Sequence, residues 1–263
     1  MKYSIGDVAR TLGLTPAALH FYEKEGVIPP KKGEASRRIY GAEDVIRLIS
    51  YKKYRSMLMP LREIAQQFSP EGDTCERIAQ KLAYQSNDVL NMARRYERMA
   101  QDIRWFEQAI RRGKDNLGRV TLEPLQPCIA LRVGPDGFIS RDRREQERVA
   151  AWLELMPATR ISVFGEAGGT ARFGYTVEAE EAQLLGLDAT PGAVSMAAGV
   201  ALHAFFKLPG TYFEHPAMAF EPLWEHMHAR GFRQAGTAVG VNLCVECHET
   251  ERDTLVEAWL PIE

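Results

Sequence analysis

Apolar residues recur at helical spacing in the first 25 residues and predict two short helices joined by a tight turn. The apolar face of the first helix consists of Ile5, Val8, Ala9 and Leu12. Ser4 is a suitable N-cap for this helix, and Gly13 permits a sharp turn after it. Thr15 caps the second helix, where Pro16 takes the first position at no cost in hydrogen bonding. The pattern of helix, glycine turn and helix predicts a helix-turn-helix.

A basic segment bracketed by prolines and glycines follows, in the stretch VIPPKKGEASRRIYGAED. Its strand-like piece, residues 37–40, predicts a hairpin wing next to the helix-turn-helix. Two further helices are expected at about 43–55 and 60–68, the second opened by Pro60.

A long polar stretch between Cys75 and Arg112 contains neither proline nor glycine. Its apolar seam alternates spacings of four and three, at Ile78, Leu82, Gln85, Val89, Met92, Tyr96, Met99, Ile103, Phe106 and Ile110. A heptad seam of this length predicts an antiparallel coiled coil that joins two copies of the chain into a homodimer. The alternative is a helix packed on its own domain.

The pattern changes after this helix to that of an α+β domain with a largely antiparallel sheet. Strands are expected in TLEPLQPCIALRVG, ISVFGEAG, ARFGYTVE, VSMAAGVALHAFFKLPG, 237–246 and 254–262, and helices at 141–156 and 215–230. The predicted organisation is α+β with two domains: a winged helix-turn-helix at 1–70, the dimerisation helix at 71–113, a linker at 114–120 and the sheet domain at 121–263.

Charge is distributed unevenly along a chain whose net charge is only −2. Residues 1–70 sum to +5, residues 71–119 to +2 and residues 120–263 to −9. The basic front suits phosphate, whereas the acidic back would repel DNA and favour cationic small molecules.

Other chemistry is weakly represented. The four cysteines are scattered and predict no disulfide framework. Cys244 to His248 spells a haem-attachment string, but a strand running into a turn explains it equally well, so we expect no cofactor and no metal. No catalytic motif occurs, which disfavours an enzyme. No secretion signal or run of about 18 apolar residues is present, so a cytoplasmic location without membrane contact is expected.

Residues 3–68 resemble the DNA-binding domain of the MerR family. The similarity lies in YSIGDVARTLGLTPAALHFYEKEGVIPP, RRIYGAEDVIRLI and LREIAQQF. The resemblance implies a dimer that binds double-stranded promoter DNA and works with RNA polymerase. It places Thr15, Ala17, Ala18, His20, Phe21 and Tyr22 at the recognition helix, and Arg37, Arg38 and Tyr40 in wing contacts to phosphate.

This chain departs from the family pattern at two places. His20-Phe21-Tyr22 stands where the family usually has Arg-Tyr-Tyr, which puts the operator sequence in doubt. Leu58 replaces a frequent glycine before the fourth helix.

The tail resembles the gyrase-inhibitor-like effector-binding domain of multidrug-sensing regulators. The similar stretches are ARFGYTVE, GVALHAFFKLPGTYFEHPAMAFEPLWEHM and VEAWLPI. Aromatic walls and a buried acid suit a hydrophobic cation, and the candidate contacts are Tyr175, Phe206, Tyr212, Trp224, Asn242, Glu246, Glu257 and Trp259. Alternation places Asn242 and Glu246 on the same face of one strand. Asn242 aligns with the family's pocket glutamate, so Glu246 is the expected substitute.

The expected function is therefore that of a ligand-responsive transcription regulator. The resemblance implies an activator that distorts promoter DNA when it binds a small hydrophobic effector, of the multidrug-efflux type. The alternative is a small-molecule binding or hydrolysing module that the DNA-binding domain tethers to DNA.

Overall fold

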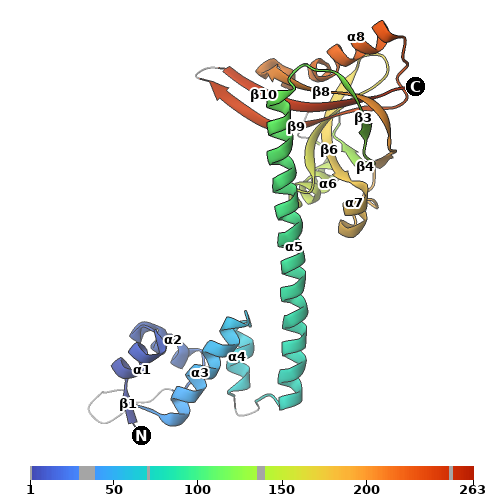
Figure 1. The fold of residues 1–263 in the computed structure, drawn as a ribbon. Coiled ribbons are helices and arrows are strands. Elements are labelled where there is room, and N and C mark those ends of the chain that lie inside the picture. Colours follow the sequence, from blue (N-terminus) through green and yellow to red (C-terminus); the bar gives the residue numbers. More distant parts are fainter. Residues whose placement is uncertain (1, 30–38, 70–71, 135–139, 249–250) are drawn as a thin grey trace. The chain divides into compact units, whose positions relative to one another are not determined.

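The computed structural model describes residues 2–29, 39–69, 72–134, 140–248 and 251–263. The chain forms two compact units, Met1–Arg95 and Tyr96–Glu263. Both units are shown in Figure 1.

The first unit begins with the two helices that the apolar pattern predicts. Its elements are β1 (Lys2–Ser4), α1 (Ile5–Leu12), α2 (Pro16–Lys24), β2 (Ile39–Gly41), α3 (Ala42–Ser56), α4 (Leu61–Gln67) and the start of α5 (Cys75–Asp115). The Ser4 side chain accepts a hydrogen bond from the Asp7 amide, and Thr15 accepts one from the Ala18 amide. Gly13 adopts a left-handed φ of 61°, which a glycine adopts without strain. The helix-turn-helix is confirmed.

The strand predicted to belong to a wing pairs with a strand that was not predicted. β2 pairs antiparallel with β1, so that Tyr40 lies opposite Tyr3. The short strand β1 was not predicted, because three residues are too few to show an alternating pattern. The remainder of the expected wing, including Arg37 and Arg38, lies outside the described residues.

The backbone conformation at Leu58 explains why a glycine is frequent at this position in the family pattern. It has a φ of 63°, in the left-handed region that side chains with a Cβ rarely adopt. The turn between α3 and α4 is therefore strained at this residue.

Two apolar clusters form the core of the first unit. One contains Leu19 of α2, Tyr40 of β2 and Leu48 of α3. The other lies between α3 and α4, and Ile78 and Leu82 of α5 pack against it. The first two seam positions of the long helix therefore pack on their own unit, as the alternative to a coiled coil predicts.

Helix α5 is 41 residues long and passes from the first unit into the second. We expected it to end before a linker at 114–120, but it continues to Asp115. Gly113 lies within the helix and does not end it. This glycine is buried, and the absence of a Cβ lets the helix pack closely against the side chains of Phe205 and Leu255. In the middle of the helix, Val89, Met92, Tyr96 and Ile103 of the predicted seam are exposed.

The second unit is an α+β domain built on one antiparallel sheet, as predicted. The strands are β3 (Thr121–Leu125), β4 (Cys128–Arg132), β5 (Arg160–Gly165), β6 (Ala171–Glu178), β7 (Ala193–Met196), β8 (Gly199–Pro209), β9 (Ala238–His248) and β10 (Glu251–Pro261). Their order in the sheet is β3-β8-β10-β9-β5-β6-β4-β7. The helical elements are α6 (Arg143–Leu153), α7 (Ala179–Leu185), α8 (Glu221–Arg230) and the 3₁₀ turns η2 (Gly210–Phe213) and η3 (Pro216–Ala219).

Three local predictions about this domain are corrected. The stretch from Thr121 to Arg132 forms two strands instead of one, broken at Gln126 and Pro127, since proline cannot donate to a sheet ladder. Helix α7 was missed. The helix expected at 215–230 is divided into η3 and α8.

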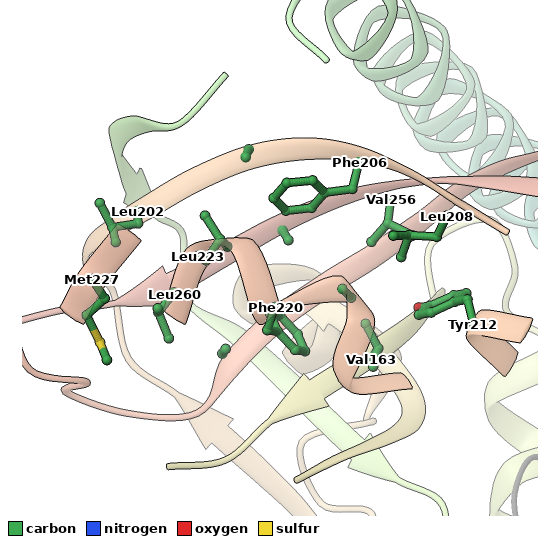
Figure 2. Packing of buried hydrophobic residues seen from close by; sticks show 14 of the residues in the cluster. Val163, Leu202, Phe206, Leu208, Tyr212, Phe220, Leu223, Met227, Val256 and Leu260 are labelled. Atoms are coloured by element: carbon green, nitrogen blue, oxygen red, sulfur yellow. The ribbon is translucent and has the colours of Figure 1, made fainter. Parts of the chain in front are cut away.

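Opposite faces of the sheet carry different layers. One face packs against η2, η3 and α8 through the large apolar cluster shown in Figure 2, where Phe206, Tyr212, Phe220 and Val256 come together. On the same face, α6 and α7 cover a second cluster around Trp152 and Tyr175. The C-terminal part of α5 packs on the other face, where Ala109 meets Phe205, Val241 and Leu255.

Gly174 of β6 permits close packing against the neighbouring strand β4. A Cβ added there would meet the Leu131 carbonyl oxygen and lie 2.9 Å from the Arg132 Cα, both backbone atoms. We expect Gly174→Ala to lower the free energy of unfolding of the second unit by about 2 kcal/mol or more, because overpacking displaces the strands. Denaturant unfolding followed by tryptophan fluorescence measures this change.

Gly199→Ala in β8 is the matched control, because an added Cβ there meets nothing within 4 Å. Its unfolding midpoint should stay near that of the unchanged protein. Equal midpoints for the two variants would contradict the packing argument.

Candidate functional site

The exposed surface of α2 contains most of the residues predicted to meet DNA. Thr15, Ala17, His20 and Phe21 are exposed, and Ala18 is partly exposed. The Phe21 side chain is 47% exposed, so it is not the core residue that its apolar character allows. On the opposite side of the helix the fully buried Leu19 anchors it to the unit. The structure thus presents a capped helix with a free outer surface.

Two of the predicted DNA contacts lie elsewhere. Tyr22 is partly buried, with its ring centroid 4.4 Å from that of Tyr51. Tyr40 is 0% exposed, and its hydroxyl donates to Glu23 Oε1 at 3.0 Å. The expected phosphate contact of Tyr40 is corrected, because the pairing of β2 with β1 turns this side chain into the core.

The predicted effector contacts are divided among several places in the domain. Tyr175 belongs to the cluster under α6 and α7, whereas Phe206 and Tyr212 belong to the cluster under α8. Trp224 packs at the edge of the latter and donates its indole N–H to Gln234 at 3.0 Å. These four aromatic residues are core side chains on the sheet face opposite α5.

A β-bulge corrects the prediction for Asn242 and Glu246. Asn242 pairs with Val256 and Cys244 pairs with Leu255, so Leu243 is the extra residue of β9. Val256 and Leu255 are adjacent on β10, so they and their partners Asn242 and Cys244 face opposite sides of the sheet. Glu246 lies two residues after Cys244 and faces the same side as Cys244, opposite to Asn242. Asn242 accepts the Tyr212 hydroxyl at 2.8 Å.

Glu246 is an exposed residue at the far end of β9. Its carboxylate lies 2.8 Å from Lys207 Nζ. The hydrogen bond from Lys207, helped by one from His248, lowers the pKa of Glu246 below its usual value. The predicted role of Glu246 as the pocket acid is therefore not supported by its position.

The haem-like string in β9 does not assemble a site either. Cys244 pairs with Leu255 and Cys247 with Arg252, three residues apart on β10, so the two thiols point to opposite faces. Both cysteines are free. Among the described residues, no cluster of three or more His, Cys, Asp or Glu side chains could hold a metal ion.

Glu257 is a fully buried acid of the domain, and it lies on the α5 face. Its side chain is 0% exposed, and Oε1 lies 2.9 Å from Arg112 Nη2 and 3.0 Å from His203 Nε2. On the other side of the imidazole, Nδ1 lies 3.2 Å from Glu123 Oε1. Burial of a carboxylate requires such partners, and here α5 supplies one of them.

Beside this network, the α5 face of the sheet is hollowed by a cavity of about 100 Å³. It is lined by Trp105, Pro124, Leu125, Gln126, Pro127, Cys128, Arg160, Thr176, Val177, Glu178, Val239, Val241 and Trp259. Trp259 is the predicted effector contact that lines it. Sequence reasoning missed Trp105, although its neighbour Phe106 is a seam position, and it missed Arg160, whose burial depends on tertiary packing.

Arg160 lies at the centre of the polar contacts of this cavity. Its guanidinium carbon is 3.8 Å from the centroid of the Trp105 ring, a cation–π stack. Nη2 lies 3.0 Å from Glu178 Oε1 and 3.5 Å from Asp102 Oδ1. Asp102 and Trp105 both belong to α5, so this helix supplies part of the cavity wall and part of its charge.

Burial changes the protonation of two groups here. Desolvation raises the pKa of the Asp102 carboxyl, although Arg160 acts in the opposite direction. Burial also raises the pKa of the Cys128 thiol to about 11, which keeps it neutral and unreactive near pH 7.

The described helix-turn-helix unit is the part of the chain that the sequence comparisons cover best. Residues 3–69 match the sequence profile of the MerR HTH family regulatory proteins. An uncharacterized HTH-type transcriptional regulator of Synechocystis sp. is 30% identical over 104 residues, which are 38% of this chain and 76% of the relative. The chain belongs to the MerR family of helix-turn-helix regulators.

Two further comparisons cover different parts of the chain. The HTH-type transcriptional activator TipA of Streptomyces coelicolor is 38% identical over 66 residues, which are 25% of this chain and 26% of TipA. In an EcmrR–DNA complex solved by cryo-electron microscopy, the similar chain has 14% identity and a TM-score of 0.39, with 99% of each chain covered. Across the described residues, none of the helices is both long and apolar enough to span a bilayer.

The raised pKa of Asp102 predicts how stability depends on pH. A carboxyl whose pKa is higher in the folded than in the unfolded state stabilises the fold at low pH, and this contribution is lost as the pH rises above the unfolded value near 4. Asp102→Asn removes the ionisation. We therefore expect the variant to gain stability relative to the unchanged protein between pH 4 and pH 7, as measured by unfolding midpoints at both values.

Asp142→Asn is a control for general charge effects, because Asp142 is an exposed N-cap of α6 and not part of this cluster. If Asp102→Asn lost relative stability on going from pH 4 to pH 7, the ion pair with Arg160 would outweigh desolvation and the argument would be wrong.

Proposed function

We propose that this protein is a dimeric, ligand-responsive regulator that binds promoter DNA through α2. The observation that carries the proposal is the exposed surface of α2, in a chain that belongs to the MerR family. His20 and Phe21 lie outermost on this surface and Leu19 holds the helix in place. A helix of this kind reads base edges in the major groove, where an apolar ring contacts thymine methyl groups.

Phosphate contacts would position this helix on the duplex. The net charge of +5 over residues 1–70 supports them, and Arg37 and Arg38 are the wing residues that we assign to this role. By family resemblance, RNA polymerase is the second partner. The protein would then activate transcription by distorting the promoter. The energy of this DNA distortion depends on the geometry of the bound dimer.

The second copy of the chain would pack along the middle of α5. Val89, Met92, Tyr96 and Ile103 belong to one heptad seam and are exposed in the single chain. Exposed apolar residues that recur at spacings of three, four and seven are typical of a helix that pairs with another helix. Pairing would place two α2 surfaces on a two-fold symmetric operator.

The effector would bind in the cavity on the α5 face of the sheet domain. Trp105 of α5 lines it, and Asp102 of the same helix contacts the lining residue Arg160. A ligand that prefers one placement of this helix over another changes the equilibrium between them. Because α5 begins in the DNA-binding unit, this preference is a physical route from effector to DNA.

Selection from a random double-stranded DNA library with the full-length protein tests the DNA-binding role. Once a preferred sequence is obtained, we expect Phe21→Ala to weaken its binding by about tenfold, since losing the match at one base pair costs about 1–3 kcal/mol. Binding to unrelated DNA should change little, because it depends on phosphate contacts.

Ile46→Ala in α3 is the matched control, as Ile46 is also an exposed apolar residue, at 62%. It should bind the selected sequence normally. Equal losses in both variants, or no enriched sequence at all, would contradict the assignment of α2 as the reading helix.

Sedimentation of charge variants in α5 tests the dimer. Met92 is 38% exposed and lies on the seam, so Met92→Glu should shift the protein from dimer to monomer at micromolar concentration, because paired carboxylates would be buried between helices. Leu90→Glu is the control, since Leu90 is 52% exposed but lies off the seam. A dimer that survives Met92→Glu and dissociates with Leu90→Glu would move the interface to another face of the helix.

A further inference from the structure

The two sides of the exposed seam on α5 differ in chemistry. One side, the small flank, consists of exposed residues with short side chains at intervals of seven, namely Ala79, Ser86, Ala93 and Ala100. The other side, the charged flank, consists of residues of alternating charge at the same interval, namely Lys81, Asp88, Arg95 and Asp102. A seam with two such different flanks restricts how a second helix can pack against it.

Asp88 and Arg95 are two free charges on the charged flank. Both are exposed, and neither forms an ion pair or a side-chain hydrogen bond with a described residue. By contrast, Lys81 and Asp102 already have ion-pair partners within the chain. Asp88 and Arg95 are therefore available to a second copy of the helix.

The direction of the second helix decides what each flank meets. In a parallel pair, the charged flank of one helix faces the small flank of the other, so Asp88 and Arg95 would meet Ala93 and Ala100. In an antiparallel pair, each flank faces its own counterpart. Charges then meet charges, and the short side chains let the two helices approach closely. The flanks therefore favour antiparallel packing.

Charge then selects among the antiparallel registers, which differ from one another by one heptad. Each register is identified by the seam residue of the partner that lies opposite Val89. In the register that places Met92 opposite Val89, Asp88 of each copy lies beside the partner's Arg95. Two-fold symmetry makes this attractive contact twice in one dimer.

The two adjacent registers place like charges together. A shift of one heptad in one direction puts Asp88 beside the partner's Asp88, and a shift in the other direction puts Arg95 beside the partner's Arg95. Like charges at an interface are costly. A second shift in either direction would bring Val89 against Ile78 or Phe106, which already pack on clusters of their own chain.

The polar groups within the seam fit the same register. Gln85 is partly buried, and Tyr96 is 65% exposed. With Met92 opposite Val89, Gln85 lies opposite the partner's Tyr96, so that the amide and the hydroxyl can form a hydrogen bond between the helices. In the adjacent registers Gln85 faces Val89 or Ile103, where its amide would be buried without a partner. A polar residue in a seam specifies register in this way.

We infer that the second copy packs antiparallel along α5 in one register, in which Asp88 and Gln85 of each copy contact the partner's Arg95 and the partner's Tyr96. The inference rests on the dimer of the proposed function and adds the contacts by which one copy recognises the other. Burial of the apolar seam supplies affinity, whereas the charges select the partner and its register.

Charge reversal followed by mixing tests the ion pair. Asp88→Arg and Arg95→Asp each turn two attractive contacts into repulsive ones, so each should raise the dissociation constant of its dimer about tenfold at low salt. An equimolar mixture of the two variants should dimerise about as tightly as the unchanged protein, because one copy then supplies two arginines and the other two aspartates. Sedimentation equilibrium of the full-length proteins measures all of these constants.

Arg94→Asp is the matched control for charge reversal. Arg94 is an exposed neighbour of Arg95, but it lies on the side of the helix away from the seam, so dimerisation should not change. Single variants that dimerise normally, or a mixture that dimerises no better than its components, would overturn the assigned contact. A tighter dimer of Asp88→Arg would indicate a different register and overturn it as well. Recovery in the mixture also excludes misfolding, since it uses the same variant chains.

A double-mutant cycle tests the contact between Gln85 and Tyr96. Tyr96→Phe should weaken the dimer about fivefold, because it leaves the facing amide without its partner. In a Gln85→Leu background the same substitution should have little effect, since no amide remains to be satisfied. Equal effects in both backgrounds would refute the hydrogen bond.

Failure of this inference is distinguishable from failure of the proposed function. A dimer that dissociates with Met92→Glu but is indifferent to charge reversal rejects the register alone. A dimer that recovers on mixing but selects no DNA sequence rejects the proposed regulator and leaves the register standing.

Discussion

The attachment of α5 to the sheet is the constraint on which the second unit depends. Two ion pairs hold it, Asp102 with Arg160 and Arg112 with Glu257. Their positions on α5 are ten residues apart, about 15 Å along the helix. Ala109 between them and the buried Gly113 just after Arg112 let the helix lie directly on Phe205 and Leu255. Buried charges are costly without partners, so each pair disfavours any register other than the observed one.

This attachment also explains where the cavity lies. The opposite face of the sheet is filled by Phe206, Tyr212, Phe220 and their neighbours, which leave a dry, close-packed core. On the α5 face, α5 is the helix that packs on the sheet, whereas α6, α7 and α8 all pack on the opposite face. The α5 face is therefore less fully covered. The uncovered part, beside Trp105 and Trp259, is the hollow that we assign to the effector. A ligand there meets the same helix that carries the dimer seam in our proposal.

Several errors in the predicted site have one physical origin. Aromatic residues near the C-terminus were grouped by their chemistry, but strand alternation divides them between two faces, as the packing of Phe206 on β8 and the lining position of Trp259 on β10 show. The bulge at Leu243 then reverses the orientation of every residue after it on β9. Glu246 is therefore moved away from Asn242, although simple alternation places them together. Such a bulge depends on the partner strand, which local sequence does not reveal.

The sequence by itself determined the elements whose signals are local. Ser4, Thr15 and Gly13 set the two helices and their turn, the absence of proline and glycine from Cys75 to Arg112 set the long helix, and alternation set most strands. The tertiary structure alone decided the pairing of β1 with β2, the burial of Tyr40, the helical state of Gly113 and the meeting of Trp105, Arg160 and Glu178 at one cavity. The physical reason is that caps, turns and periodicity act over a few residues, whereas burial and ion pairing depend on side chains that are distant in sequence and adjacent only after folding.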